Sequence, residues 1–190
     1  MLKRNMKKMI LLVFLVLIAC AFCTPVSAAK QKKVLVAYFS ATGTTKAAAK
    51  KVKKAAGGTL YRIRPVKAYT SADLDYDNDD CRATREQRSA SARPAVKGKV
   101  KKIRKYDVIF VGYPIWWGKE PKVIKTFLES YNLKGKTVIP FCTSGSSGIS
   151  GSMKGIRKSA GSAKVLAGKD LTDLSYKQVR KWVKNVMKKA

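Results

Sequence analysis

Apolar runs alternate with amphipathic segments through most of the chain. Mostly apolar runs at 33–39, 106–112 and 137–141 are typical of strands buried on both faces, and shorter strands are expected at 59–64 and 163–166. Helical spacing is found at 44–56, 121–131 and 153–159, and a short helix is expected near 83–89. A last helix is expected after Ser175, which would cap its start. This alternation predicts an α/β domain: a doubly wound, five-stranded parallel sheet with helices on both faces.

Three loops of unusual composition leave the ends of these strands. Since the carboxyl ends of parallel strands meet at one edge, we expect all three to line a single ligand site there. The first loop reads Ser-Ala-Thr-Gly-Thr-Thr and opens a helix, where free backbone N–H groups and the helix dipole favour an anion. We interpret it as a phosphate cradle, against the alternative of an ordinary turn with a Thr cap. Its candidate ligand residues are Ser40, Thr42, Gly43, Thr44 and Thr45.

The second and third loops offer different chemistry. The second carries two adjacent tryptophans, which are costly to leave exposed unless something flat covers them. One of them is expected to close the core and the other to stack on a ligand ring. The third is rich in Ser and Gly, so its backbone can approach a polar ring edge, unless it is simply a flexible linker. The candidate residues are Pro114, Ile115, Trp116, Trp117, Gly118, Thr143, Ser144, Gly145 and Gly148.

Charge and composition narrow the function classes. The chain has 41 basic and 11 acidic residues, a net charge of +30. Such a field attracts anionic lipid, cell-wall polymer or nucleic acid, but the basic residues are scattered and no nucleic-acid-binding motif accompanies them. Nucleic acid is therefore the least favoured partner. The sequence has no histidine, which argues against Ser-His and Cys-His catalysis and against the usual zinc and copper sites. No metal site and no catalytic acid or base is expected.

The first residues have the order of an export signal. Four basic residues precede the apolar run 9–19, and a small-residue site ends at Ala28. We expect residues 1–28 to be a signal peptide and 29–190 to be one domain, with a net charge of +26 once the signal's four basic residues are removed. A lipoprotein signal over 1–19, with lipidation at Cys20, is the alternative. Either route predicts an exported, extracytoplasmic protein, secreted or held at the cell surface. Cys81 and Cys142 would remain, more typical of isolated thiols than of a bridge.

The three loops together resemble the flavodoxin-like FMN-binding proteins. The resemblance rests on Ser-x-Thr-Gly-x-Thr after the first strand, Tyr-Pro-Ile-Trp-Trp-Gly after the third and Thr-Ser-Gly-Ser-Ser-Gly after the fourth, and it covers nearly all of 33–189. The stretch from Asp73 through Arg82 and Glu86 is similar to the branch with an extended second loop. The resemblance implies that 40–45 hold the FMN phosphate, that 114–118 flank the isoalloxazine ring and that 143–148 bond its pyrimidine side. Many flavodoxins place a Tyr in this last loop, and none stands here, which leaves one ring face open or covered by Trp117.

The expected function is redox chemistry through bound FMN. The protein would carry electrons or reduce a small acceptor, with the flavin performing the chemistry and the fold tuning it. Two alternatives stay open: an NAD(P)H-dependent quinone or azo reductase, and a cationic cell-surface binding protein that has lost the flavin. The sequence names no redox partner protein, and an anionic membrane or wall surface is a candidate partner.

Overall fold

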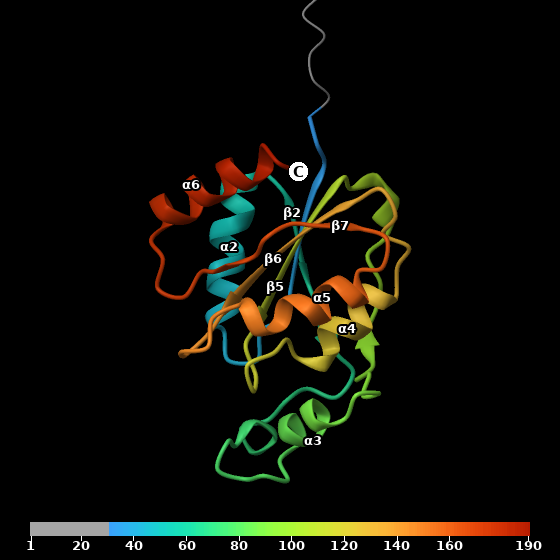
Figure 1. The fold of residues 1–190 in the computed structure, drawn as a ribbon, viewed down its shortest axis with the longest axis vertical. Helices are drawn as coiled ribbons and strands as arrows, with labels where there is room; N and C mark the ends of the chain where they lie inside the picture. Colours follow the sequence, from blue (N-terminus) through green and yellow to red (C-terminus); the bar gives the residue numbers. More distant parts are fainter. Residues whose placement is uncertain (1–30) are drawn as a thin grey trace, which may run out of the picture. The chain divides into compact units, whose positions relative to one another are not determined.

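The computed structural model describes residues 31–190 of the chain (Figure 1). The expected signal segment, with both of its processing sites, lies outside the described residues. Among the helices of residues 31–190, none combines the length and the apolar composition that crossing a bilayer requires.

A parallel sheet forms the centre of the described domain. Strand β5 lies in the middle of the sheet. On one side it is followed by β1 and then β2, and on the other by β6 and then the two short strands β7 and β8, which both pair with β6. All of these pairings are parallel, so the carboxyl ends of the strands lie at one edge. The strands are β1 (Val34–Tyr38), β2 (Thr59–Arg62), β5 (Val108–Pro114), β6 (Thr137–Thr143), β7 (Lys164–Val165) and β8 (Lys169–Asp170).

Helices cover both faces of this sheet. On one face, α2 (Thr44–Ala56) packs beside α6 (Tyr176–Met187) over a core that includes Phe110 and Phe141 (Figure 1). On the other face, α4 (Lys122–Glu129) and α5 (Met153–Ser159) cover a second core. The predicted doubly wound α/β architecture is therefore confirmed. The predicted cap of the last helix is also confirmed, because the Ser175 hydroxyl accepts from the Gln178 N–H and Gln178 bonds back to the Ser175 N–H.

The strand predicted at 163–166 is present as β7, but the observed strand continues beyond the predicted range in a second piece, β8. Two short pieces, β7 and β8, pair with the same neighbour β6. Between the pairs Val138↔Val165 and Phe141↔Lys169, β6 advances three residues while the partner advances four. The extra residue is a bulge, and it divides the strand. Gly168 lies at this point, where an added Cβ would come 3.0 Å from the Pro140 carbonyl oxygen.

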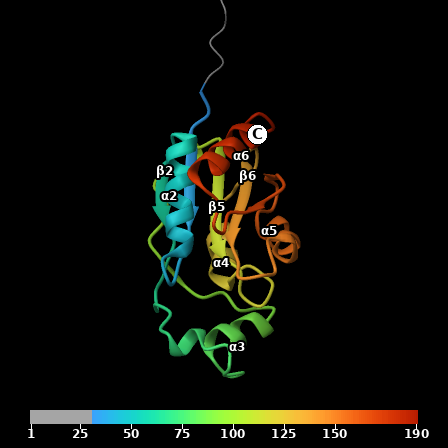
Figure 2. The ribbon, with the colours of Figure 1, turned by 90° about the vertical axis from the view of Figure 1, so that its left-hand side faces the viewer.

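Most of the segment between β2 and β5, including its helix, lies beyond the carboxyl edge of the sheet (Figures 1 and 2). Its last residues return to the opposite edge, where β5 begins and the Asp107 N–H donates to the Lys33 carbonyl oxygen. The segment contains the predicted short helix, here α3 (Arg82–Arg88), and an antiparallel pair that the sequence pattern did not predict. Each partner of that pair is only two residues long, too short for a periodic signal. The elements of the segment are β3 (Arg64–Pro65), η1 (Ala72–Leu74), α3, β4 (Val96–Lys97) and η2 (Ile103–Lys105).

An aromatic cluster anchors this segment to the sheet edge. The Trp116 ring packs edge-to-face on Phe39 and on Tyr69, with centroids 5.4 and 4.8 Å apart. The Arg82 guanidinium lies 4.0 Å from the centre of the Tyr69 ring and forms an ion pair of 2.7 Å with Glu86. The Tyr69 hydroxyl in turn donates to Glu86, and burial raises the pKa of that phenol. Stacking, cation–π contact and a charge-assisted hydrogen bond therefore converge on Tyr69.

The two cysteines of the described chain are buried free thiols. The Cys81 sulfur lies 3.2 Å from the Thr84 hydroxyl, at the start of α3. Cys142 lies in β6, where burial raises the pKa of its thiol and the nearby Asp170 carboxylate raises it further. The Cys142 thiol is therefore a poor nucleophile at neutral pH.

Replacement of Gly112 by Ala should destabilise the domain by about 1–3 kcal/mol, the usual cost of overpacking a core. Gly112 pairs with Phe141 on the neighbouring strand, and a Cβ at Gly112 would overlap the Phe141 ring. Urea unfolding followed by circular dichroism measures the effect. The matched control is Gly145→Ala, because a Cβ there meets nothing within 4 Å. Equal stability of the two variants would contradict the prediction.

Candidate functional site

A pocket of about 310 Å³ opens at the carboxyl edge, and all three predicted loops contribute to its walls. Among the predicted site residues, the structure brings together Thr42, Thr44, Thr45, Pro114, Ile115, Trp116, Thr143, Ser144 and Gly145. The lining also includes residues that the sequence did not single out, namely Ala41, Leu74, Tyr76 and Thr172. The remaining predicted residues, Ser40, Gly43, Trp117, Gly118 and Gly148, belong to the same loops without lining the pocket.

The first loop presents neutral hydrogen-bond donors at the start of α2. Gly43 has a φ of 108°, a value that L side chains rarely adopt, and its N–H donates to the Ser40 hydroxyl over 3.1 Å. Within residues 31–190, no acceptor is found for the N–H groups of Thr42, Thr44 and Thr45. These N–H groups and the helix dipole form an environment that favours an anion. The loop therefore has the geometry that a phosphate cradle needs.

The first and third loops are joined by a buried hydrogen bond. The hydroxyls of Thr45 and Thr143 lie 2.7 Å apart, and both residues are buried at the ends of their elements. A methyl group in place of either hydroxyl would leave the remaining hydroxyl without this hydrogen-bond partner. The bond therefore fixes the distance between two walls of the pocket.

The two tryptophans of the second loop have different environments, as the sequence suggested. Trp116 is buried at 5% exposure in the aromatic cluster, whereas Trp117 is 44% exposed. Backbone hydrogen bonds between Trp116 and Lys119, of 2.9 and 3.0 Å, close a two-residue turn. Both central residues have positive φ, 50° for Trp117 and 70° for Gly118, as in a type I′ turn. For a residue as bulky as Trp this conformation is a source of strain.

An aromatic pair stands at the rim of the pocket. The rings of Tyr76 and Trp117 lie 5.1 Å apart at 45°, and each residue is a little less than half exposed. Tyr76 comes from the long segment after β2, far from the three loops in sequence. The sequence prediction noted that the third loop lacks a Tyr, and the structure places Tyr76 in the lining instead. Two exposed rings at a pocket rim are a surface that a flat ligand can cover.

The third loop is held by Thr172, another residue that sequence reasoning missed. The Thr172 hydroxyl accepts from the Ser144 N–H over 2.8 Å and lies 2.6 Å from an Asp170 carboxylate oxygen. The Gly148 N–H donates to the Ser144 hydroxyl over 3.1 Å. Gly148 therefore stabilises the conformation of the loop through this hydrogen bond and does not line the pocket. A lone Thr after a two-residue strand carries no sequence signal that would have identified it.

The pocket offers hydrogen bonding and aromatic contact rather than acid-base chemistry. Its lining contains no acidic or basic side chain, and Tyr76 is its single titratable residue. Tyr113, which begins the second loop's motif, is fully buried, and its hydroxyl is 2.9 Å from that of Ser152. Burial raises the pKa of this phenol, so it stays neutral. In the described part of the chain, no three Cys, Asp or Glu side chains gather as a metal ion would require.

Comparison with known proteins identifies the family. The family profile described as flavodoxin matches residues 33–186. The chain belongs to the flavodoxin family. No curated protein matches this flavodoxin significantly.

Solved structures give the same family assignment. A Bacteroides eggerthii protein assigned as a flavoprotein is 47% identical, with a TM-score of 0.78 over 82% of this chain and 98% of its own. A Bacteroides uniformis protein with the same assignment is 46% identical, with a TM-score of 0.78 over 82% of this chain and 99% of its own. A flavoprotein from Lactobacillus acidophilus, solved in complex with FMN, is 25% identical, with a TM-score of 0.63 over 80% of this chain and 98% of its own. The predicted resemblance is thereby confirmed at the level of the family.

The hydroxyl pair of Thr45 and Thr143 should show energetic coupling. Either single Val substitution leaves a buried hydroxyl without its partner and is expected to cost about 1–3 kcal/mol of stability. The double Val variant removes both polar groups and should cost less than the sum of the two. Urea unfolding of all four proteins measures the coupling as a double-mutant cycle. Strict additivity would show that this hydrogen bond does not join the two loops in solution.

Proposed function

We propose that this flavodoxin binds FMN in the pocket at the carboxyl edge and uses it as a redox centre. The observation that carries the proposal is the set of unpartnered N–H groups and threonine hydroxyls in the first loop, which lies beside an aromatic rim in one pocket. Membership of the flavodoxin family supports FMN as the cofactor, as does the FMN complex of the Lactobacillus acidophilus relative.

The residues present fit each part of FMN. The loop of 40–45 would hold the phosphate through neutral donors, with the dipole of α2 adding to the attraction. The third loop would contact the polar edge of the ring through Thr143, Ser144 and Gly145. Trp117 and Tyr76 would cover the exposed side of the ring, whereas Trp116 closes the core beneath. Gly118 and Gly148 would act through the conformation of their loops.

The proposed chemistry is electron transfer, or reduction of a small acceptor, through the bound flavin. FMN supplies one- and two-electron redox chemistry when bound. The chain's own part is to bind and orient the cofactor and to exclude water from one ring face. No side chain in the pocket lining is placed to act as a catalytic acid or base, so proton exchange would rely on solvent at the open rim.

The export signal and the charge suggest where this chemistry takes place. The basic, apolar and small-residue segments at the start of the sequence support an extracytoplasmic location, secreted or at the cell surface. The net charge supports association with an anionic membrane or wall surface, and it supports a redox partner whose docking face is acidic.

Removal of the first-loop hydroxyls should weaken FMN binding selectively. Thr42→Val and Thr44→Val each remove one hydrogen bond to a charged group, so each is expected to lower FMN affinity by about tenfold or more. Titration of flavin fluorescence measures the affinity. Riboflavin lacks the phosphate, so its affinity should not change. Thr59→Val, on the exposed strand β2, is the matched control and should bind FMN as the parent protein does. Equal weakening of riboflavin binding would place the phosphate elsewhere.

The positive field of the protein should raise the redox potential of bound FMN. Reduced flavin is anionic at neutral pH, and surrounding positive charge favours the anion over the neutral oxidised form. Since salt screens this field, the midpoint potential of the bound flavin should fall as ionic strength rises, by more than that of free FMN. Potentiometric titration at two salt concentrations measures the difference. A potential as negative as that of acidic flavodoxins, with no salt dependence, would contradict the expectation.

A further inference from the structure

A second pocket, of about 300 Å³, lies on the side of α4 and α5 and is strongly cationic. Its lining contains six basic side chains and one carboxylate, that of Glu129. The basic residues of this cationic pocket are Arg88, Arg93, Lys119, Lys122, Lys125 and Lys158. The flavin site proposed above has no charged residue in its lining, so the two pockets differ in the ligand chemistry they suit.

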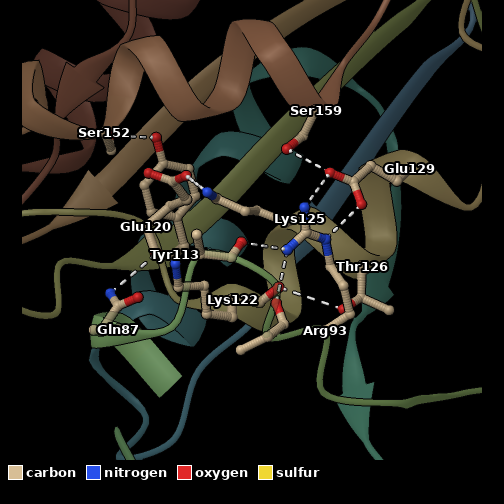
Figure 3. Close-up of polar contacts among 12 residues, drawn as sticks. Gln87, Arg93, Tyr113, Glu120, Lys122, Lys125, Thr126, Glu129, Ser152 and Ser159 are labelled. Carbon is tan, nitrogen blue, oxygen red and sulfur yellow. Dashed lines mark hydrogen bonds and ion pairs between the residues drawn. The ribbon is translucent and has the colours of Figure 1, made fainter. Parts of the chain in front are cut away.

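Three of these cations already have carboxylate partners. Arg93 forms an ion pair of 2.6 Å with Glu129, which also accepts from the Ser159 hydroxyl (Figure 3). This contact lowers the pKa of the Glu129 carboxyl and raises the pKa of the Arg93 guanidinium. Lys125 lies 3.6 Å from Glu120, and Arg88 lies 2.7 Å from Asp79.

The other three cations have no carboxylate partner within residues 31–190. They are Lys119, Lys122 and Lys158, and residues 1–30 contain no Asp or Glu that could supply one. Lys122 is the most informative of them, because it is only 6% exposed and yet lines the pocket. Burial and the neighbouring Lys125 lower the pKa of its ammonium, the Glu120 carboxylate opposes this shift in part, and Arg93 and Lys119 add to the lowering. The pocket therefore holds positive charge that the folded chain does not neutralise.

The position of Lys122 is also unfavourable locally. It is the first residue of α4, where the helix dipole favours an anion over a cation. A lysine at this position is therefore unfavourable for two reasons: the helix dipole and the other cations repel its charge, and burial removes the ammonium from water. A bound anion would remove both conflicts, because it would interact favourably with the ammonium groups and with the start of α4.

Glu120 and Gln87 hold the inner wall of the pocket in place. Glu120 is buried below α5 at Gly155, where a Cβ would overlap its carboxylate, and burial raises the pKa of Glu120. The Gln87 amide donates to the carbonyl oxygens of Trp116 and Glu120, over 2.8 and 3.1 Å (Figure 3 shows its bond to Glu120). Contacts within the protein therefore hold this wall in place, which lowers the cost of ordering it when a ligand binds.

We propose that the cationic pocket is a binding site for a phosphate group carrying two or more negative charges, from a small phosphate ester, a diphosphate or a phospholipid headgroup. The open groups are all ammonium ions, which bind phosphate as point charges, whereas the guanidinium groups that suit planar carboxylates are already engaged. This site is distinct from the flavin site, because it shares no lining residue with the proposed FMN pocket.

Calorimetric titration with inorganic pyrophosphate tests the proposal on the full protein, with its flavin content recorded. The parent protein should bind with an affinity that falls as salt is raised. Lys122→Met keeps the apolar stem and removes the charge, so it should weaken binding by about tenfold or more. Lys119→Gln combined with Lys158→Gln changes only exposed side chains, so this variant should fold normally and should also lose affinity.

The matched control is Lys177→Gln combined with Lys181→Gln, on exposed positions of α6 and so on the opposite face of the sheet. It removes the same net charge and should bind pyrophosphate as the parent does.

A second arm measures co-sedimentation with phosphatidylcholine vesicles, with and without phosphatidic acid. Loss of vesicle binding in the pocket variants alone, without pyrophosphate binding, would identify a headgroup as the ligand. Equal losses in pocket and control variants, or no binding in either arm, would overturn the proposal. FMN binding is measured separately, by flavin fluorescence, so the two proposals fail separately.

Discussion

The parallel pairing of β5 with both of its neighbours is the constraint on which the flavin site depends. β5 pairs with β1 from Val34↔Val108 to Tyr38↔Gly112, and with β6 as far as Pro114↔Thr143. These registers bring three strand ends to one edge, so the loops that leave them share a pocket. The hydroxyl bond of Thr45 to Thr143 can form only because the ladder brings the start of α2 against the end of β6. The glycine at 112 belongs to the same constraint, since it leaves room for the Phe141 ring in the core between the sheet and α2.

Charge is distributed in an unusual way over this fold. The chain is strongly basic, yet the pocket that would receive the phosphate of FMN is lined by hydroxyls, backbone N–H groups and aromatic rings. Neutral donors at a helix start bind an anion without the desolvation cost of a buried ammonium. In the proposed function, the basic residues would instead act on the flavin from a distance through their summed field. On the opposite side of the Trp116–Lys119 turn they gather closely enough to form a pocket of their own.

The sequence was sufficient for the main architecture, because long apolar runs and helical spacing are strong signals. Four of the five strands, the helices and the capped start at Ser175 lie where the pattern predicted them. The split of the fifth strand could not be predicted. Each of its two pieces is only two residues long, which is too short for an alternating pattern of apolar and polar residues that could reveal a one-residue bulge. The same limit applies to the site. Loops that follow strands were predictable from chain order, whereas Tyr76 and Thr172 reach the pocket only through tertiary packing.

The turn from Trp116 to Lys119 is a physical connection between two ligand environments. Trp116 lines the neutral pocket, Lys119 lines the cationic one, and two backbone hydrogen bonds join these residues directly. Gln87 bonds the same turn from the cationic side, and the strained φ of Trp117 lies at its tip. A shift of this turn on binding at one pocket would therefore also move a lining residue of the other pocket. Thermodynamic linkage then requires the effect to be reciprocal: whatever factor an anion imposes on flavin binding, the flavin imposes on the anion.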